Sequence, residues 1–204
     1  MSSSLSVTLA GRHVTLTPLS LEDVPGLVLA ASGDRSTYGW SIVPATIDEM
    51  EVVVRRQLAE RDQRTGVPFA TRRRDTGEII GMTRFLTLRW YFGREYPDAA
   101  EIGGTFVTAA LQRTAVNTEA KLLMMTHAFD VWDVRRLDLK TDERNERSRR
   151  AIERIGGQLE GILRNWQAAQ VQGEEGLTRN AAMYSILPSE WPGVRARLEE
   201  RLRV

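Results

Sequence analysis

The residues best suited to bind a ligand form a short polar stretch, Gln112–Asn117, between a strand-like segment and an apolar helical segment. Arg113 offers a planar guanidinium with several N–H donors. Thr114, Asn117 and Thr118 offer further donors or can cap a helix. Because a helix N-terminus has free backbone N–H groups and the positive end of the helix dipole, it favours an anion. The stretch therefore predicts an anion site, and an ordinary helix cap without a ligand is the alternative.

Composition excludes several other chemistries. The chain of 204 residues has no cysteine, and so no disulfide, thiolate zinc site or cysteine nucleophile. Its two histidines, His13 and His127, are too few for a multi-histidine centre, and we expect no metal. The first residues lack a signal-peptide pattern, and no apolar run approaches the roughly 18 residues that span a membrane. We therefore expect a cytoplasmic protein without a membrane partner.

The basic residues are almost all arginine. Only Lys121 and Lys140 are lysines among 28 basic residues, against 27 acidic residues and a net charge of +1. The near-neutral balance disfavours a nucleic-acid partner. Arg72–Arg74 form a cluster, but it flanks a turn at Asp75–Gly77, so we interpret it as a solvated hairpin tip. The arginine excess reflects either a GC-rich genome or a phosphate-binding surface.

Hydrophobic periodicity and capping signals divide the chain into alternating strands and helices. In the first half they predict a strand at Val14–Pro18, a helix from Ser20 to about Ala31, a helix opened by a Thr46–Glu49 capping box, and hairpin strands at Phe69–Thr71 and Ile79–Phe85. In the second half they predict strands at Glu101–Val107 and Arg136–Thr141, helices at Thr118–Trp132 and Asn145–Ile155, a hairpin of Gly161–Gln167 and Arg179–Leu187, and a helix at Pro192–Leu202. This order indicates a mixed α/β fold with a parallel crossover. No linker divides the chain, so we expect one domain over residues 1–204.

Four segments of the second half carry a family resemblance: EIGGTFV, TEAKLLMMTHAFD, NERSRRAIERIGGQLEGILR and RNAAMYSILPSEW. In this order and spacing the chain resembles the GNAT superfamily of acetyl-CoA-dependent N-acetyltransferases, most nearly the ribosomal-protein N-terminal (RimJ/RimL-like) branch. The resemblance implies an α/β (α+β) GNAT fold. Its central sheet would be mixed, mostly antiparallel and twisted, flanked by helices, with a splayed parallel strand pair that holds acetyl-CoA.

The resemblance also implies where the cofactor binds. The strand at Glu101–Val107 would bond the pantetheine arm and supply oxyanion donors, and the following loop and helix start would hold the pyrophosphate. The cofactor-binding residues would be Phe106, Val107, Arg113, Thr114, Ala115, Asn117, Thr118, Asn145 and Ser148. The loop departs from the family pattern, because Gln112–Asn117 contains neither of the usual glycines.

Three residues are candidates for catalysis by the same resemblance. Asn145 and Ser148 would face the pantetheine and the sulfur. Ser148 would be the general acid or would position a water that is, because Ile152 stands where many members have a tyrosine. Glu101 is the candidate base, acting through a water. The alternatives are that Asn145 and Ser148 only cap and pack their helix, and that Glu101 is an exposed residue at a strand end.

The leading hypothesis is an N-acetyltransferase that moves the acetyl group of acetyl-CoA to a primary amine by direct attack in a ternary complex. The amine would belong to a protein N-terminus or to a small molecule, and the resemblance implies a homodimer. A non-catalytic acyl-CoA sensor of the same fold is the alternative, motivated by the missing glycines. An RNA-binding protein that uses its arginine clusters is the third hypothesis.

Overall fold

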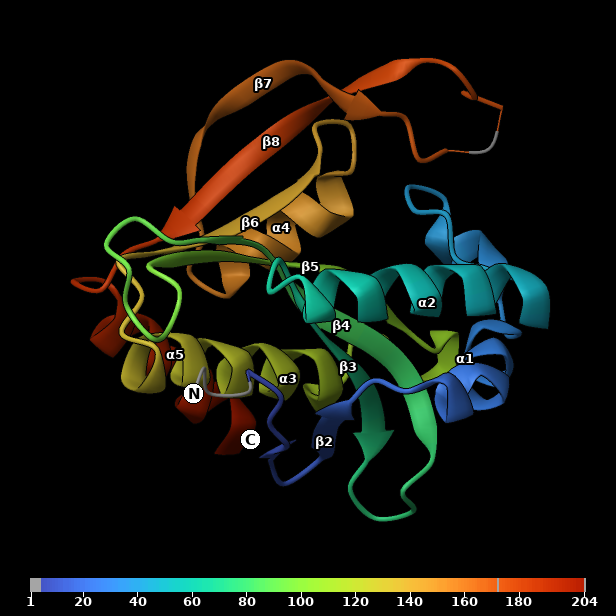
Figure 1. Ribbon diagram of the computed structural model, residues 1–204, viewed down its shortest axis with the longest axis horizontal. Coiled ribbons are helices and arrows are strands. Elements are labelled where there is room, and N and C mark those ends of the chain that lie inside the picture. The colour runs from blue at the N-terminus through green and yellow to red at the C-terminus, as the bar shows by residue number, and fades with distance from the viewer. Residues whose placement is uncertain (1–4, 172, 204) are drawn as a thin grey trace.

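In the computed structural model, which describes residues 5–171 and 173–203, an eight-stranded sheet is covered by helices on both faces (Figure 1). The strand order is β1-β2-β3-β4-β5-β6-β8-β7. The neighbours β5 and β6 run parallel, and the other neighbouring pairs run antiparallel. The predicted mixed, mostly antiparallel sheet is therefore confirmed.

The strands are β1 (Leu9–Ala10), β2 (Val14–Pro18), β3 (Val67–Arg73), β4 (Ile79–Arg89), β5 (Ala99–Val107), β6 (Arg136–Asp142), β7 (Gln158–Ala168) and β8 (Thr178–Ile186). The α-helices are α1 (Val24–Ala31), α2 (Ile47–Asp62), α3 (Ala115–Thr126), α4 (Glu146–Arg154) and α5 (Trp191–Arg203). Short 3-10 turns are η1 (Leu21–Asp23), η2 (Arg35–Tyr38) and η3 (Ala109–Leu111), and a π-helical turn, η4 (His127–Val131), follows α3.

The helix predicted at Thr118–Trp132 has different ends in the structure. It begins three residues earlier, at Ala115, because the Thr114 hydroxyl accepts the N–H of Val116 and caps the first turn. Its regular part ends at Thr126. In none of the described helices is there a stretch long and apolar enough to cross a membrane.

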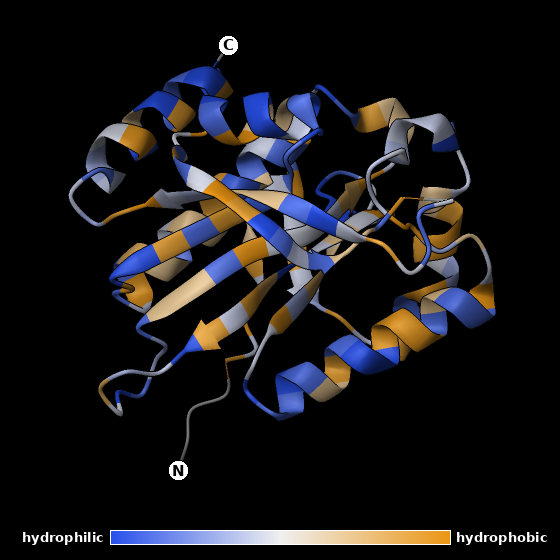
Figure 2. Cartoon of the chain, turned by 90° about the horizontal axis from the view of Figure 1, so that it is seen from above, coloured by the Kyte–Doolittle hydropathy of each residue, from blue (hydrophilic) through white to orange (hydrophobic). Residues whose placement is uncertain are grey.

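Each face of the sheet has its own hydrophobic cluster. Helices α3 and α5 cover the larger cluster, which includes Phe85 and Trp132 (the α3 face). Helices α1 and α2 cover a smaller one, which includes Met50 and Phe106 (the α2 face). Hydrophobic and hydrophilic residues alternate along several strands, as Figure 2 shows, because successive side chains of a strand point to opposite faces.

Two charged side chains of α3 are buried, which the prediction of an apolar helix did not include. The Glu119 carboxylate accepts the N–H groups of Arg12 and Val14, each at 2.8 Å, and so holds the β1–β2 turn. Lys121 Nζ donates to Thr105 Oγ1 at 2.7 Å and to Thr83 Oγ1 at 3.2 Å. Burial lowers the pKa of Lys121 to about 7.

A bulge in β5 changes which side chains face the α2 face. Gly104 has a φ of +56°, a left-handed conformation that favours glycine, and the β4–β5 register shifts at this point. As a result Thr105 points to Lys121 on the α3 face, whereas the next residue, Phe106, packs in the α2-face cluster. The bulge lies in the half of β5 that has no partner strand on its β6 side.

Candidate functional site

The site is built around an opening between the two parallel strands. Ala99–Ile102 pair with Arg136–Leu139, and the strands then separate. Within the described residues, Gly103–Val107 pair with β4 alone, and the last three residues of β6 pair with β8 alone. Backbone N–H and C=O groups on this edge therefore lack a strand partner, and they can bond an extended ligand as another strand would.

Of the two residues predicted to donate from β5, Val107 presents its backbone to the opening. The N–H of Thr108 donates to Ile80 O on β4 at 2.7 Å. Because backbone groups alternate in direction along a strand, those of Val107 point the other way. The Val107 carbonyl accepts from the Tyr38 hydroxyl at 3.2 Å. Phe106 instead lies opposite Met82 in the β4 ladder.

The loop after β5 leads directly into the first turn of α3. Arg113 is exposed and has a φ of +64°, so an arginine takes the left-handed conformation that glycine adopts more easily. The N–H groups of Ala115–Asn117 lie in the first turn of α3, where the helix itself supplies no acceptor. The N–H of Val116 is bonded by the Thr114 hydroxyl. Thr118 lies one residue beyond this turn. Asn117 Oδ1 is buried and has no hydrogen-bond partner within the described residues.

A glutamine ties this loop to the other side of the opening. Gln112 Nε2 donates to Val107 O and to Thr37 Oγ1, each at 3.1 Å. Its Oε1 accepts from Arg147 on α4. Arg147 has no local signal in the sequence, because its partner is 35 positions away.

Asn145 and Ser148 lie together at the start of α4. Asn145 is the N-cap, and its Oδ1 accepts the N–H of Ser148 at 3.0 Å. The capping role is therefore real, and it occupies only one of the two polar atoms of the Asn145 amide. Ser148 is half-buried in the first turn, directly after the end of β6.

Glu101 lies on the α2 face, next to the point where β5 and β6 separate. Its side chain is 7% exposed, so the interpretation as an exposed strand-end residue is wrong. Oε2 accepts from Lys140 Nζ at 3.1 Å. A Cβ atom added to Gly103 would lie 3.4 Å from Oε1, which shows that the carboxylate extends over the first unpaired residue of β5. Within the described residues no hydrogen bond occupies Oε1.

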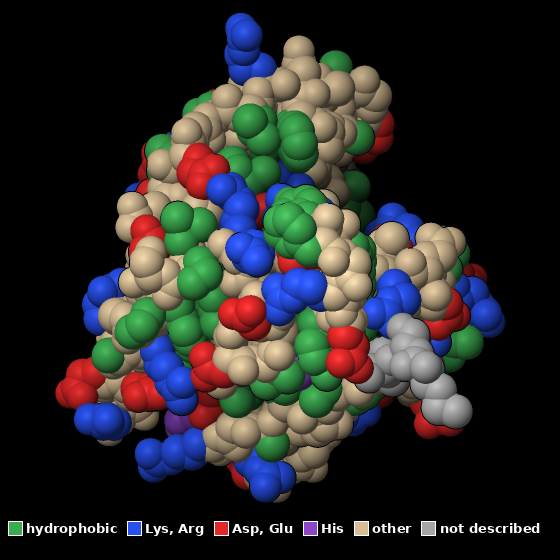
Figure 3. Space-filling view, turned by 60° about the vertical axis from the view of Figure 1, so that its left-hand side comes forward, with side chains coloured by type: hydrophobic (Ala, Val, Ile, Leu, Met, Phe, Trp, Pro, Cys, Tyr) green, Lys and Arg blue, Asp and Glu red, His purple; other side chains and the backbone are tan. Residues whose placement is uncertain are grey.

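One tryptophan contacts the lysine of this charged pair, and a second contacts Arg144. The ring of Trp166 on β7 lies 5.6 Å from Lys140 Nζ, and the ring of Trp40 lies 4.8 Å from the Arg144 guanidinium. The β7–β8 hairpin forms the upper part of the molecule (Figure 1). In Figure 3 an indentation on the right-hand side separates this upper part from a second part at the lower right. The ring of Trp90 stacks with the Arg64 guanidinium.

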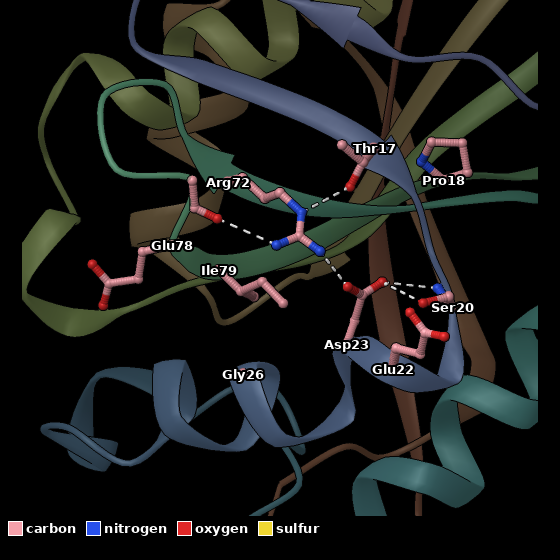
Figure 4. Close-up of a pocket in the computed structure, with 10 residues that line it drawn as sticks. Thr17, Pro18, Ser20, Glu22, Asp23, Gly26, Arg72, Glu78 and Ile79 are labelled. Atoms are coloured by element: carbon pink, nitrogen blue, oxygen red, sulfur yellow. Dashed lines mark hydrogen bonds and ion pairs between the residues drawn. The ribbon is translucent and has the colours of Figure 1, made fainter.

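A surface depression of about 550 Å³ lies elsewhere, between β2, β3 and α1. Figure 4 shows that two of its charged groups, Arg72 and Asp23, bond each other and neighbouring polar groups. Arg72 donates to Thr17 Oγ1, Gly77 O and Asp23, and Asp23 also accepts the N–H of Ser20. A second depression of about 290 Å³ borders the first turn of α3 at Thr114–Val116. Of these two depressions, only the second adjoins the loop that leads from β5 into α3.

The model of the acetyltransferase (GNAT) domain family matches residues 13–158. The chain belongs to this family. No curated protein sequence matches the chain. Among solved structures, a GCN5-related N-acetyltransferase from Brucella melitensis has a TM-score of 0.81 and 28% identity, with 96% of this chain and 85% of that chain covered.

Two further structural neighbours show the same fold. RimJ from Mycobacterium smegmatis, solved in complex with CoA-disulfide, has a TM-score of 0.81 at 18% identity, and the match covers 100% of this chain and 98% of that chain. The ribosomal-protein-S5-alanine acetyltransferase from Vibrio fischeri has a TM-score of 0.70 at 14% identity, with 91% and 98% covered. The family and fold make this chain an acetyl-CoA-dependent acetyltransferase.

The residues of the opening fit an acyl-CoA. An unpaired strand edge suits the amide groups of a pantetheine arm, and the first amides of α3 suit a pyrophosphate.

Proposed function

We propose that the protein acetylates a primary amine by direct attack, with the amine on the α2 face of the β5–β6 opening. The observation that carries this proposal is the buried Glu101 carboxylate, whose Oε1 extends over Gly103, where the two strands separate. A proton acceptor at this position lies beside the strand edge that would hold acetyl-CoA, the acetyl donor. Acetyl-CoA supplies an acetyl group already activated as a thioester.

The binding of acetyl-CoA is assigned to both sides of the opening. On the β5 side Val107 offers its backbone N–H as the candidate donor to an oxygen that gains negative charge, while its carbonyl accepts from Tyr38 and Gln112. Arg113, the first amides of α3 and the side chains of Asn117 and Thr118 hold the phosphates. Asn145 contributes from the β6 side, through the amide nitrogen that its capping role leaves available.

Proton transfer is assigned to two residues. Glu101 Oε1 accepts the proton of the attacking amine through a water, while the ion pair with Lys140 fixes Oε2. Ser148 Oγ supplies the proton that the departing sulfur requires, because Ile152 leaves no phenol on the next turn of α4. Tyr38 orients the strand edge through its bond to Val107 O.

The test combines acetyl-CoA binding with turnover. Thermal shift measures binding, and a thiol-release assay on a panel of peptides and small amines measures transfer. Stabilisation together with amine-dependent thiol release supports the proposal. Stabilisation without release on any amine supports the acyl-CoA sensor, and the absence of both contradicts the two functions together.

A further inference from the structure

A buried arginine on the α2 face has almost no partner. Arg179 on β8 is 8% exposed, and within the described residues its guanidinium makes no hydrogen bond. Its nearest acidic contact is Asp142 Oδ2, at 4.0 Å from Nη1. Burying Nε without a hydrogen bond costs folding free energy, because the protein does not replace the water that this nitrogen loses.

Asp142 does not need Arg179, because another arginine already satisfies it. The Asp142 carboxylate accepts the Arg144 N–H at 2.9 Å, Nε at 3.0 Å and Nη2 at 2.8 Å. The Arg179 guanidinium therefore lies beside a carboxylate whose bonds are directed elsewhere. It retains a planar set of donors that suits a second carboxylate.

The register of the strands places this guanidinium on the same face as the proposed base. Asp142 and Lys140 lie opposite Ala181 and Met183, and directly opposite residues share a face. Arg179 is two positions from Ala181, so its side chain emerges on that face as well. Burial lowers the pKa of Arg179, while the negative charges of Asp142 and Glu101 act in the opposite direction. Glu101 is therefore close enough for its charge to act on the guanidinium.

We propose that Arg179 binds a carboxylate of the acceptor, so that the substrates are amines that also carry a carboxylate. This inference rests on the proposed function, since it places the acceptor amine near Glu101. A carboxylate is favoured over a phosphate because Glu101 and Asp142 face the same space, and a doubly charged group would be repelled more strongly.

The experiment compares acceptors that differ only in this charge. Peptides that begin with Asp or Glu are paired with their Asn or Gln counterparts, β-alanine with its amide, and phosphoethanolamine with ethanolamine. We expect kcat/KM for at least one carboxylate acceptor to exceed that of its amide partner by roughly tenfold or more, since charge-assisted bonds are about twice as strong as neutral ones. Equal values in all carboxylate pairs, or a preference for the phosphorylated amine, would overturn the inference.

Variants assign the preference to Arg179. In Arg179→Gln the carboxylate-to-amide ratio falls to about one, and Arg179→Lys, which keeps the charge without the planar fork, gives an intermediate ratio. Arg201→Gln removes the same charge from an exposed position of α5 on the other face and retains the wild-type ratio. An unchanged ratio in Arg179→Gln would overturn the assignment.

The melting temperature separates binding from a structural role. Because Arg179 is buried without hydrogen bonds, we expect Arg179→Gln to melt no lower than wild type. A large decrease would identify Arg179 as a structural residue and overturn the inference. Turnover that is equal for carboxylate and amide acceptors rejects this inference alone. Binding of acetyl-CoA without turnover on any amine rejects the proposed function, and this inference with it.

Discussion

Particular buried charges on the two faces of the central sheet differ in how completely they are bonded. On the α3 face, Glu119 is saturated by backbone N–H groups and Lys121 by two hydroxyls, within a large apolar cluster. On the α2 face above β5 and β6, Glu101 keeps one oxygen unbonded, and Arg179 makes no hydrogen bond within the described part of the chain. The first arrangement positions elements of the fold, and the second leaves polar groups available for a substrate.

The two lysines of the chain show the same difference on a smaller scale. Lys121 has hydroxyl acceptors and no carboxylate, and burial lowers its pKa to about 7. Lys140 forms an ion pair with Glu101 and lies near the ring of Trp166. Lys121 therefore connects α3 to the back of the β5 bulge, whereas Lys140 orients a carboxylate on the opposite face.

The largest effect is expected at Glu101. Glu101→Gln keeps the size of the side chain and removes the proton acceptor, and we expect kcat/KM to fall by about 10²–10⁴-fold. The melting temperature should fall as well, but less, because the variant leaves Lys140 without its carboxylate. Amine-dependent thiol release and thermal unfolding measure the two effects. A variant that retains wild-type turnover would show that Glu101 is not the base.

The neighbouring residue provides the matched experiment on the other face. Ile102 is 2% exposed and belongs to the α3-face cluster, so Ile102→Ala should lower the free energy of unfolding by about 2–5 kcal/mol. We expect kcat/KM per folded molecule to change little at a temperature where the variant stays folded. Denaturant unfolding and active-site-normalised rates test this. A loss of turnover as large as that of Glu101→Gln would end the functional distinction between the faces.

Local signals predicted most of the fold correctly, because they act between residues close in sequence. The Thr46–Glu49 capping box forms with both of its hydrogen bonds, and Asn145 caps α4. The features that complete the site are contacts between distant segments. Arg147 meets Gln112 across 35 positions, and Lys121 meets Thr83 across 38. No periodicity or cap distinguishes these residues from other arginines and lysines on a helix.

The sequence pattern also does not predict which charged side chains are buried. Glu119 and Lys121 lie in a helix whose apolar residues correctly predicted burial, but the pattern did not show that these two ions are buried with them. Their acceptors and donors are hydroxyls and backbone groups of strands, which any sequence contains. The same holds for Arg179, since only the strand register places it beside Asp142 and near Glu101.

Lys121 gives the next largest effect, and it depends on pH. Its pKa is about 7 in the folded protein and ordinary, near 10.5, when unfolded, so the unfolded chain binds more protons between these values. Wild-type stability should therefore rise from about pH 7 to 10, by a few kcal/mol. Below pH 7 this contribution stays constant at its least favourable value.

Lys121→Met removes this dependence. The difference in unfolding free energy between variant and wild type should be largest at pH 6 and shrink at pH 9.5, and all other titrating groups cancel in that difference. Urea unfolding at three pH values measures it. A difference that does not vary with pH would mean that Lys121 titrates in the folded state as it does in the unfolded chain.

Asn145 lies at the boundary between the two kinds of role. Asn145→Ala removes the N-cap of α4 and should cost about 1 kcal/mol of stability. If the amide nitrogen also contacts the cofactor, kcat/KM falls by more than about tenfold. A tenfold loss corresponds to about 1.4 kcal/mol, so the loss in kcat/KM then exceeds the loss of stability. Asn145→Asp keeps the cap oxygen without the nitrogen, so it should retain stability and lose turnover. Equal losses of stability and turnover in Asn145→Ala would show that Asn145 caps α4 and has no role in cofactor binding.

The smallest effect is expected in the loop that lacks the family's glycines. Arg113 has a left-handed backbone, so Arg113→Gly relieves a local strain while it removes the guanidinium. Stability should rise by less than about 1 kcal/mol, since glycine also makes the unfolded chain more flexible. If the guanidinium binds phosphate, the KM for acetyl-CoA should rise several-fold despite the relaxed loop. Arg113→Lys keeps both the charge and the strain, so a KM for acetyl-CoA near that of wild type would show that Arg113 binds the phosphate through its charge. An unchanged KM in Arg113→Gly would instead show that the α3 amides hold the phosphates alone.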